Sequence, residues 1–154
     1  MKKILNQKIL IIISWAAVLA LMVLIFNFSA QVAEESNELS TGITEKIVKM
    51  VASVVPNQNF DVGELNHFVR KNAHFFVYLT LGLLVINAWR RSGVRGFKSF
   101  VFSLAICVLY ATSDEVHQLF VPGRGGQVSD VLLDSAGATV GIGLYFAISR
   151  IKIR

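Results

Sequence analysis

The chain has 154 residues, of which 54% are hydrophobic and 16% are charged, and its formal net charge is +5. A mean hydropathy of +0.59 excludes an ordinary soluble domain and is typical of a small membrane protein with several spans. The single cysteine, Cys107, lies within an apolar run, which excludes a disulfide framework and a cysteine metal site within the chain.

The first apolar segment, residues 9–28, follows Lys2, Lys3 and Lys8. It is long enough to cross a hydrocarbon core of about 30 Å. A cleavable signal peptide also begins with basic residues, but its apolar core is shorter and a small-x-small cleavage site should follow. Residues 28–33 contain no convincing site of this kind. We therefore expect a retained transmembrane anchor.

Residues 29–70 are polar and acidic, and we expect them to form an external loop with structure of its own. Apolar residues at helical spacing predict an amphipathic helix that lies along the outer membrane surface and ends at Pro56. This helix could cap the bundle or gate a substrate. Asp61 and Glu64 resemble a capping box, which predicts the start of a new helix. The apolar residues of the amphipathic helix are Ile43, Ile47, Met50, Val51, Val54 and Val55.

The second predicted span, residues 73–89, continues this new helix and carries a polar stripe. The stripe residues are four, three and four positions apart, which places them on one helix face. Arg70 lies beside the stripe, and we expect it to reach toward the lipid headgroups. His74 lies one turn inside the apolar run, so we expect it to face the bundle interior. The stripe consists of His67, Lys71, His74 and Tyr78.

The third predicted span, residues 97–115, follows a short basic loop and carries a second polar stripe. Its members are again three or four positions apart, so they share a helix face. Residues 121–126 have the sequence VPGRGG, which predicts a helix break and a flexible turn. The stripe consists of Cys107, Tyr110, Asp114 and either His117 or Gln118, with Glu115 beside it.

The fourth predicted span, residues 131–149, begins with carboxylates. Asp130 falls in the first turn of the helix, where a negative charge suits the helix dipole. Asp134 lies one turn deeper, and an ionisable side chain costs about 2.5–3.5 kcal/mol at the centre of a membrane helix. On the same face, Gly137 and Gly141 form a small-xxx-small ridge that lets a neighbouring helix come close.

The distribution of charge predicts the orientation of the chain. With four spans and the N-terminus inside, the inner segments hold ten positive charges and no acid, and all ten carboxylates fall outside or at the outer ends of the spans. The positive-inside rule therefore predicts an N-in, C-in arrangement. Both polar stripes then meet at the outer leaflet, on the extracytoplasmic side. The inner charges are Lys2, Lys3, Lys8, Arg90, Arg91, Arg95, Lys98, Arg150, Lys152 and Arg154.

Short motifs along the chain carry a resemblance to a known family. They are Asn27-Phe28-Ser29-Ala30-Gln31, Lys71-Asn72-Ala73-His74-Phe75 with Tyr78 and Gly82, Tyr110 with Ser113-Asp114-Glu115, Gln118-Leu119-Phe120, Pro122-Gly123-Arg124, and Asp130 with Asp134 and Gly137. Together they resemble the VanZ-like family over nearly the whole chain, as a single domain of residues 1–154. The resemblance implies a four-span protein of the bacterial cytoplasmic membrane. The founding member is associated with low-level resistance to teicoplanin, a glycopeptide with a fatty acyl chain, but the resemblance implies no mechanism.

One hypothesis for the polar residues is an enzyme. Carboxylates and imidazoles could bind a divalent metal, or a carboxylate beside His74 could act as general acid or base on a lipid-linked envelope substrate. Lys71 and Arg124 would then hold a phosphate. The chain lacks the motifs of lipid phosphatases and of membrane prenyl-type proteases, and no serine or cysteine has an obvious activating base. The candidate catalytic residues are His74, Asp114 and Glu115, with His117 as a further metal ligand.

The hypothesis that we rank first is binding without turnover. Lys71 and Arg124 beside a carboxylate cluster could recognise an amphiphile such as a membrane lipid, a lipid-linked envelope precursor or a lipoglycopeptide. We expect no cofactor and no nucleic acid, and the chain has no nucleotide-binding loop. A third possibility is that the charges only neutralise one another, although four acids outnumber the two bases. The predicted ligand-binding residues are Lys71, His74, Tyr78, Tyr110, Asp114, Glu115, Gln118, Arg124, Asp130 and Asp134.

Overall fold

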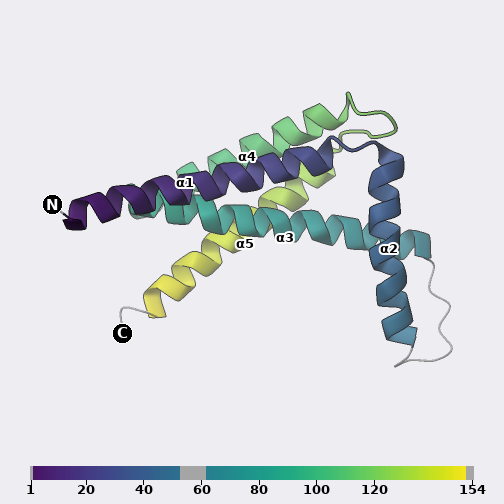
Figure 1. Cartoon of the computed structure of the whole chain (residues 1–154), viewed down its shortest axis with the longest axis horizontal. Helices are drawn as coiled ribbons and strands as arrows, with labels where there is room; N and C mark the ends of the chain where they lie inside the picture. The colour runs from purple at the N-terminus through teal and green to yellow at the C-terminus, as the bar shows by residue number, and fades with distance from the viewer. Residues whose placement is uncertain (1, 53–61, 152–154) are drawn as a thin grey trace.

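The computed structural model describes residues 2–52 and 62–151, and these residues form helices joined by short loops (Figure 1). No strand occurs in these two ranges, which confirms the predicted all-α class. The helices are α1 (Lys2–Ser29), α2 (Ala33–Ala52), α3 (Val62–Arg91), α4 (Phe97–Gln118) and α5 (Val128–Ile151).

Four of the described helices are long and apolar enough to cross a membrane, which confirms the expected number of candidate spans. Each is longer than the apolar run that predicted it. Hydropathy detects only the apolar middle of a span, whereas the backbone hydrogen bonds of a helix continue through its polar ends. The N-in, C-in orientation stays a prediction. The candidate spans are Ile4–Ser29, Leu65–Arg91, Phe97–Gln118 and Val128–Ser149.

Helix α2 extends across the end of the bundle at which α1 ends (Figure 1). It exposes Ile43, Ile47 and Met50, whose spacing places them on one face, as an amphipathic helix requires. Its position on a membrane surface stays a prediction. The expected helix end at Pro56 and the expected start at Asp61 lie outside the described residues, as does the side chain of Glu64.

A partly buried cluster of polar side chains fixes α2 to the first turns of α3. The amide nitrogen of Asn66 donates to Asn37 Oδ1 at 2.7 Å and to Thr41 Oγ1 at 3.2 Å. Thr44 Oγ1 donates to the Ser40 carbonyl at 2.9 Å and lies 3.4 Å from Asn66 Oδ1. Because Asn66 is buried, the hydrogen bonds of its amide replace those that it would otherwise make to water. They therefore hold α2 in one place relative to the bundle.

Helix α3 is the centre of the bundle, since it contacts α1, α2, α4 and α5, and its largest contact is with α5. The buried core lies along this helix and is filled by aliphatic, aromatic and small side chains, as is common between membrane helices. At the far end of the bundle from α2, the rings of Trp15 and Trp89 pack edge to face, with 5.1 Å between their centroids. The core includes Val18, Ile25, Tyr78, Leu81, Val85, Cys107, Ala111 and Ala138.

Glycines let the backbones of α3 and α5 touch. A Cβ atom on Gly137 would overlap the carbonyl oxygen of Phe75, and one on Gly141 would overlap that of Leu79. On α3, Gly82 meets the α5 backbone in the same way. The predicted small-xxx-small ridge is therefore confirmed, and the structure identifies α3 as the helix that packs on it.

We expect Gly141→Ala to lower the free energy of unfolding by about 1–3 kcal/mol, because the added methyl group forces the two helices apart. Gly143→Ala is the matched control, since this glycine lies on the same helix and a methyl group added to it would have no atom within 4 Å. The control should be neutral or slightly stabilising, because alanine favours a helix by about 1 kcal/mol over glycine. Equal losses in both variants, measured by denaturation in detergent, would contradict the role of the ridge.

Candidate functional site

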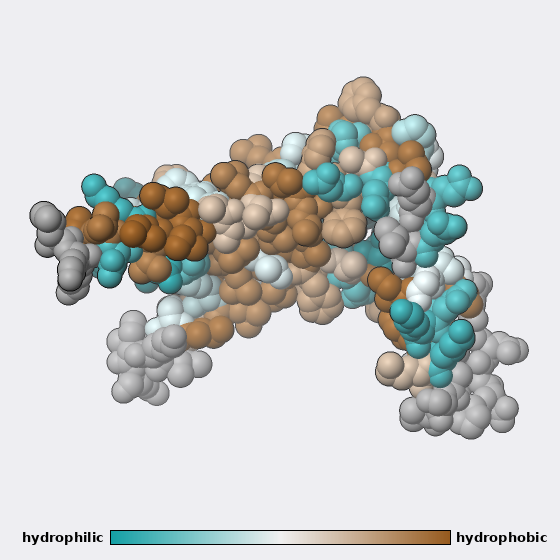
Figure 2. Space-filling model, in the orientation of Figure 1, coloured by the Kyte–Doolittle hydropathy of each residue, from teal (hydrophilic) through white to brown (hydrophobic). Residues whose placement is uncertain are grey.

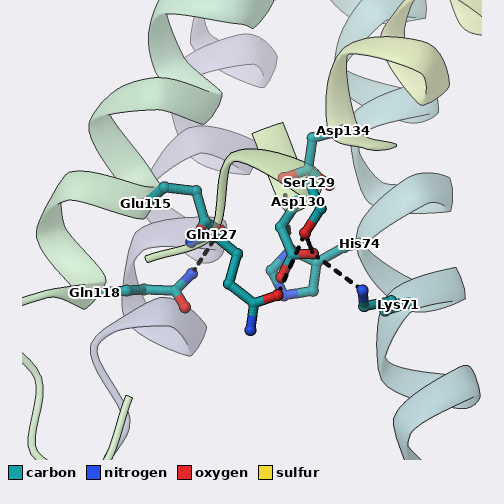
Figure 3. Close-up of polar contacts among 8 residues, drawn as sticks. All are labelled: Lys71, His74, Glu115, Gln118, Gln127, Ser129, Asp130 and Asp134. Atoms are coloured by element: carbon teal, nitrogen blue, oxygen red, sulfur yellow. Dashed lines mark hydrogen bonds and ion pairs between the residues drawn. The ribbon is translucent and has the colours of Figure 1, made fainter. Parts of the chain in front are cut away.

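Polar residues from α3, α4 and α5 gather at the end of the bundle where the 119–127 loop joins α4 to α5 (Figure 3). They adjoin an open cavity of about 190 Å³. Half of the ten predicted ligand-binding residues line this cavity, and the other half lie outside its lining. The predicted residues that line it are Lys71, His74, Gln118, Arg124 and Asp130. Those outside the lining are Tyr78, Tyr110, Asp114, Glu115 and Asp134.

Two ion pairs join α3 to α5 beside the cavity. Lys71 Nζ lies 3.4 Å from Asp130 Oδ1, and about a third of each side chain is exposed. One turn deeper, His74 Nδ1 lies 3.7 Å from Asp134 Oδ2, which is within ion-pair range but too long for a good hydrogen bond. Asp134 is completely buried. Lys71 and His74 therefore each have a carboxylate facing them from α5.

Glu115 organises the opposite wall of the cavity. Its Oε1 accepts a hydrogen bond from Gln118 Nε2 at 3.2 Å, and its Oε2 accepts one from the Gln127 backbone N–H at 2.8 Å. Ser129 Oγ donates to Gln127 Oε1 at 3.3 Å and lies 3.2 Å from Asp130 Oδ1. The buried carboxylate thus connects the end of α4 to the loop and to the start of α5, and it holds both glutamines at the cavity.

Two buried carboxylates keep oxygens that have no hydrogen-bond partner among the described residues. Asp134 lacks one on both oxygens, and Asp114 lacks one on Oδ1, although its Oδ2 lies 3.4 Å from Gln118 Nε2. The hydroxyl of Ser29 is buried beside Asp114 and is also without a hydrogen bond in the described part of the chain. Buried oxygens of this kind are uncommon, because each loses its hydration. They distinguish this end of the bundle from ordinary core and make it the candidate functional region.

The two predicted tyrosines have positions below the cavity rather than in its wall. The hydroxyl of Tyr110 donates to the backbone carbonyl of Met22, so it fixes α4 to α1. Tyr78 is fully buried, and its ring centroid lies 6.3 Å from that of Tyr110. Both rings are therefore part of the core that packs beneath the charged residues.

The loop that carries Arg124 is fixed at several points. Gly123 has a φ of 76°, which favours glycine in this turn. The Ala33 N–H donates to the Pro122 carbonyl at 3.3 Å, and Arg124 Nη2 donates to the Phe28 carbonyl at 3.3 Å. The loop therefore connects to the end of α1 and the start of α2, and this brings a half-buried guanidinium into the cavity wall.

Arg70 and His67 also line the cavity, and neither was among the predicted ligand-binding residues. Burial lowers the pKa of Arg124, and the nearby positive charge of Arg70 lowers it further. Two guanidinium groups that repel each other across one cavity would both be stabilised by an anion. Arg70 was expected only to reach toward the headgroups. Arg70 lines the cavity because the loop that carries Arg124 folds over it, and helical spacing alone does not indicate the path of this loop.

His117 does not join the other candidates. Its ring stacks on Phe26 of α1, with 4.5 Å between the centroids, and it does not line the cavity. Of the two residues that could complete the second stripe, Gln118 is the one at the cavity. In the described ranges no three His, Cys, Asp or Glu side chains are arranged to hold a metal ion. The proposed metal set of His74, Asp114, Glu115 and His117 is therefore not assembled.

A comparison with protein families gives a match to the VanZ/LLP1 family model over residues 14–150. Comparisons with curated proteins and with solved structures give no match. The matched range contains every residue that lines the cavity and all four candidate spans except the first turns of α1.

The two ion pairs should differ in strength. Because Asp134 is buried, we expect a double-mutant cycle of His74→Ala and Asp134→Ala to give a coupling energy of about 1–3 kcal/mol in the free energy of unfolding. The half-exposed pair of Lys71 and Asp130 should give about 0.2–1 kcal/mol. Denaturation in detergent measures both cycles. A larger coupling energy for the pair of Lys71 and Asp130 would contradict the conclusion that the buried pair is the stronger one.

Proposed function

Because the chain belongs to the VanZ/LLP1 family, we propose that it binds an amphiphile with an anionic head group at the outer leaflet of a bacterial cytoplasmic membrane. The ligand class is a membrane lipid or a lipid-linked envelope precursor. We further propose that this binding lowers susceptibility to lipoglycopeptides such as teicoplanin. The observation that carries the proposal is the cavity wall, where Arg70, Lys71 and Arg124 stand against one carboxylate from the described residues, Asp130.

The residue types in the wall suit a phosphate that also carries hydroxyl groups. A guanidinium can bind a phosphate through two parallel hydrogen bonds, and a lysine binds it as a point charge. Gln118 and Gln127 supply amide groups that pair with hydroxyls. Asp130 can accept from a hydroxyl or an amine. The deeper carboxylates act through these groups, since Asp134 faces His74 and Glu115 holds both glutamines.

The size and position of the cavity favour an amphiphile. At about 190 Å³ it is smaller than the pockets of about 300–1,000 Å³ that enclose whole drug-sized ligands. It therefore has room for a head group only. It opens at the end of the candidate spans Leu65–Arg91 and Val128–Ser149, so an acyl or prenyl chain could remain in the surrounding lipid. Exposed apolar residues on these spans, including Phe68, Phe76 and Leu132, offer that chain a surface.

Binding can be tested with a polyprenyl diphosphate and the uncharged polyprenol of the same chain length. We expect the diphosphate to bind more tightly, and Arg70→Gln, Lys71→Gln and Arg124→Gln each to weaken it by about tenfold, since a charged hydrogen bond contributes about 1.5 kcal/mol or more. The three changes should leave the weak binding of the polyprenol unaltered. Titration of protein in nanodiscs measures both affinities.

Lys46→Gln is the matched control for this titration, because Lys46 is an exposed cation on α2 that does not line the cavity. It should bind the diphosphate as the wild type does. If the control loses as much affinity as Arg124→Gln, the effect is one of overall charge and the cavity is not the binding site.

The link to resistance can be tested in a teicoplanin-susceptible bacterium that expresses the protein. We expect the wild type to raise the minimum inhibitory concentration of teicoplanin by about twofold or more, and Arg124→Gln to abolish the increase at equal expression, because about 1.5 kcal/mol of binding is lost. Lys46→Gln should retain it. For the same glycopeptide without its acyl chain, the minimum inhibitory concentration should not change with any of these proteins. Undiminished resistance with Arg124→Gln would show that the resistance does not depend on the cavity.

A further inference from the structure

A second hollow, of about 340 Å³, lies where α3 and α5 end, at the opposite end of α3 from the first cavity. Figure 2 shows hydrophilic side chains at both ends of the bundle and a hydrophobic band between them. The hollow is shallow, and three arginines line it. Its lining consists of Asn87, Arg90, Arg91, Arg95 and Tyr145.

Two of the arginines are held in place by neighbouring side chains. The guanidinium carbon of Arg90 lies 5.9 Å from the centre of the Phe146 ring, within the range of a cation–π contact. Arg91 Nε donates to Asn87 Oδ1 at 3.2 Å. These contacts restrain the two side chains and leave their terminal nitrogens available, so less conformational entropy is lost when an anion binds.

No carboxylate of the described residues compensates this positive charge. None of their Asp or Glu side chains lines the hollow, and the ion pairs found in residues 2–52 and 62–151 both lie at the other end, at Lys71 and His74. The positive-inside rule explains why a loop at this end is basic. It does not require three arginines from a helix end and a loop to share one hollow with a tyrosine and an asparagine. Their mutual repulsion makes the hollow favourable for an anion.

The first cavity and the hollow are separated along α3 by about the thickness of a hydrocarbon core. Arg91 follows Lys71 by twenty positions on α3, and a rise of about 1.5 Å per residue separates them by about 30 Å, the thickness of a hydrocarbon core. If the first cavity is at one headgroup layer, the hollow is therefore at the other. Next to it, α5 exposes the apolar residues Leu144 and Ile148, which can contact acyl chains.

We propose that this hollow binds the phosphate groups of an anionic phospholipid, with preference for a lipid that carries two phosphates. Each guanidinium can contact a phosphate through two hydrogen bonds. A phosphatidylcholine head group is attracted less strongly, because its choline cation cancels the charge of its phosphate. Asn87 and Tyr145 supply polar groups for the glycerol between two phosphates. The two sites share no residue, so each can be tested separately, but the depth of the hollow rests on the bilayer placement of the proposed function.

The test uses the full chain, delipidated in detergent and titrated with diphosphatidylglycerol or with phosphatidylcholine of the same acyl chains. Native mass spectrometry measures bound lipid. We expect the wild type to retain diphosphatidylglycerol at least about tenfold better than phosphatidylcholine, and Arg90→Gln with Arg91→Gln and Arg95→Gln to abolish this preference. Lys98→Gln is the matched control, because Lys98 follows the same loop but does not line the hollow. It should keep the preference.

Three results would overturn the proposal. One is equal lipid retention by the wild type and the triple arginine variant, and another is an equal loss in Lys98→Gln. The third is displacement of the lipid by millimolar inorganic phosphate, which would assign the hollow to a free anion. Arg124→Gln should leave this lipid preference intact, so failure of one site is distinguishable from failure of the other.

If the triple variant does not fold, thermal unfolding of the wild type tests the proposal instead. Diphosphatidylglycerol should raise its melting temperature and phosphatidylcholine should not, because only a ligand that binds the folded state stabilises it. An equal shift with both lipids would contradict the proposal.

Discussion

The close crossing of α3 and α5 determines what the rest of this bundle can do. Gly137 and Gly141 place the α5 backbone directly on that of α3 at Phe75 and Leu79. The residues that precede this contact on both helices therefore face each other at short range. The result is a pair of ion pairs that no loosely packed helices could form in register: Lys71 with Asp130 and His74 with Asp134.

Buried carboxylates at this end act as a frame for the cavity. Asp134 faces His74, and Glu115 accepts hydrogen bonds from Gln118 and from the backbone of Gln127. Ionisable groups near a membrane core are costly and are retained mainly where they have a function. In this bundle they orient the side chains that line the cavity, while the cationic groups of the lining come from α3 and the loop. This division explains why acids outnumber bases in the region although the lining itself is basic.

The sequence was sufficient for the four spans, the polar stripes and the glycine ridge, because hydropathy and helical spacing are local properties of the chain. It also located one end of the bundle as the meeting point of the charged residues. It did not indicate the contact of Asn66 with Asn37 and Thr41, since polar residues in an external segment have many possible partners. The choice between His117 and Gln118 likewise depended on a small rotation of the helix, which places His117 against Phe26.

The two basic sites differ in a way that follows from the segregation of acids along the chain. At the first cavity, Asp130 and the carboxylates behind it limit the positive charge, so the proposed ligand would need matched hydrogen bonds as well as electrostatic attraction. At the second hollow, the three arginines have no carboxylate among the described residues that line it, so electrostatic attraction would dominate the proposed lipid binding. A bundle held by its arginines at one headgroup layer would have a fixed depth in the bilayer. Because α3 is rigid over about 30 Å, that depth would place the first cavity at the opposite headgroup layer, where an amphiphile presents its head group.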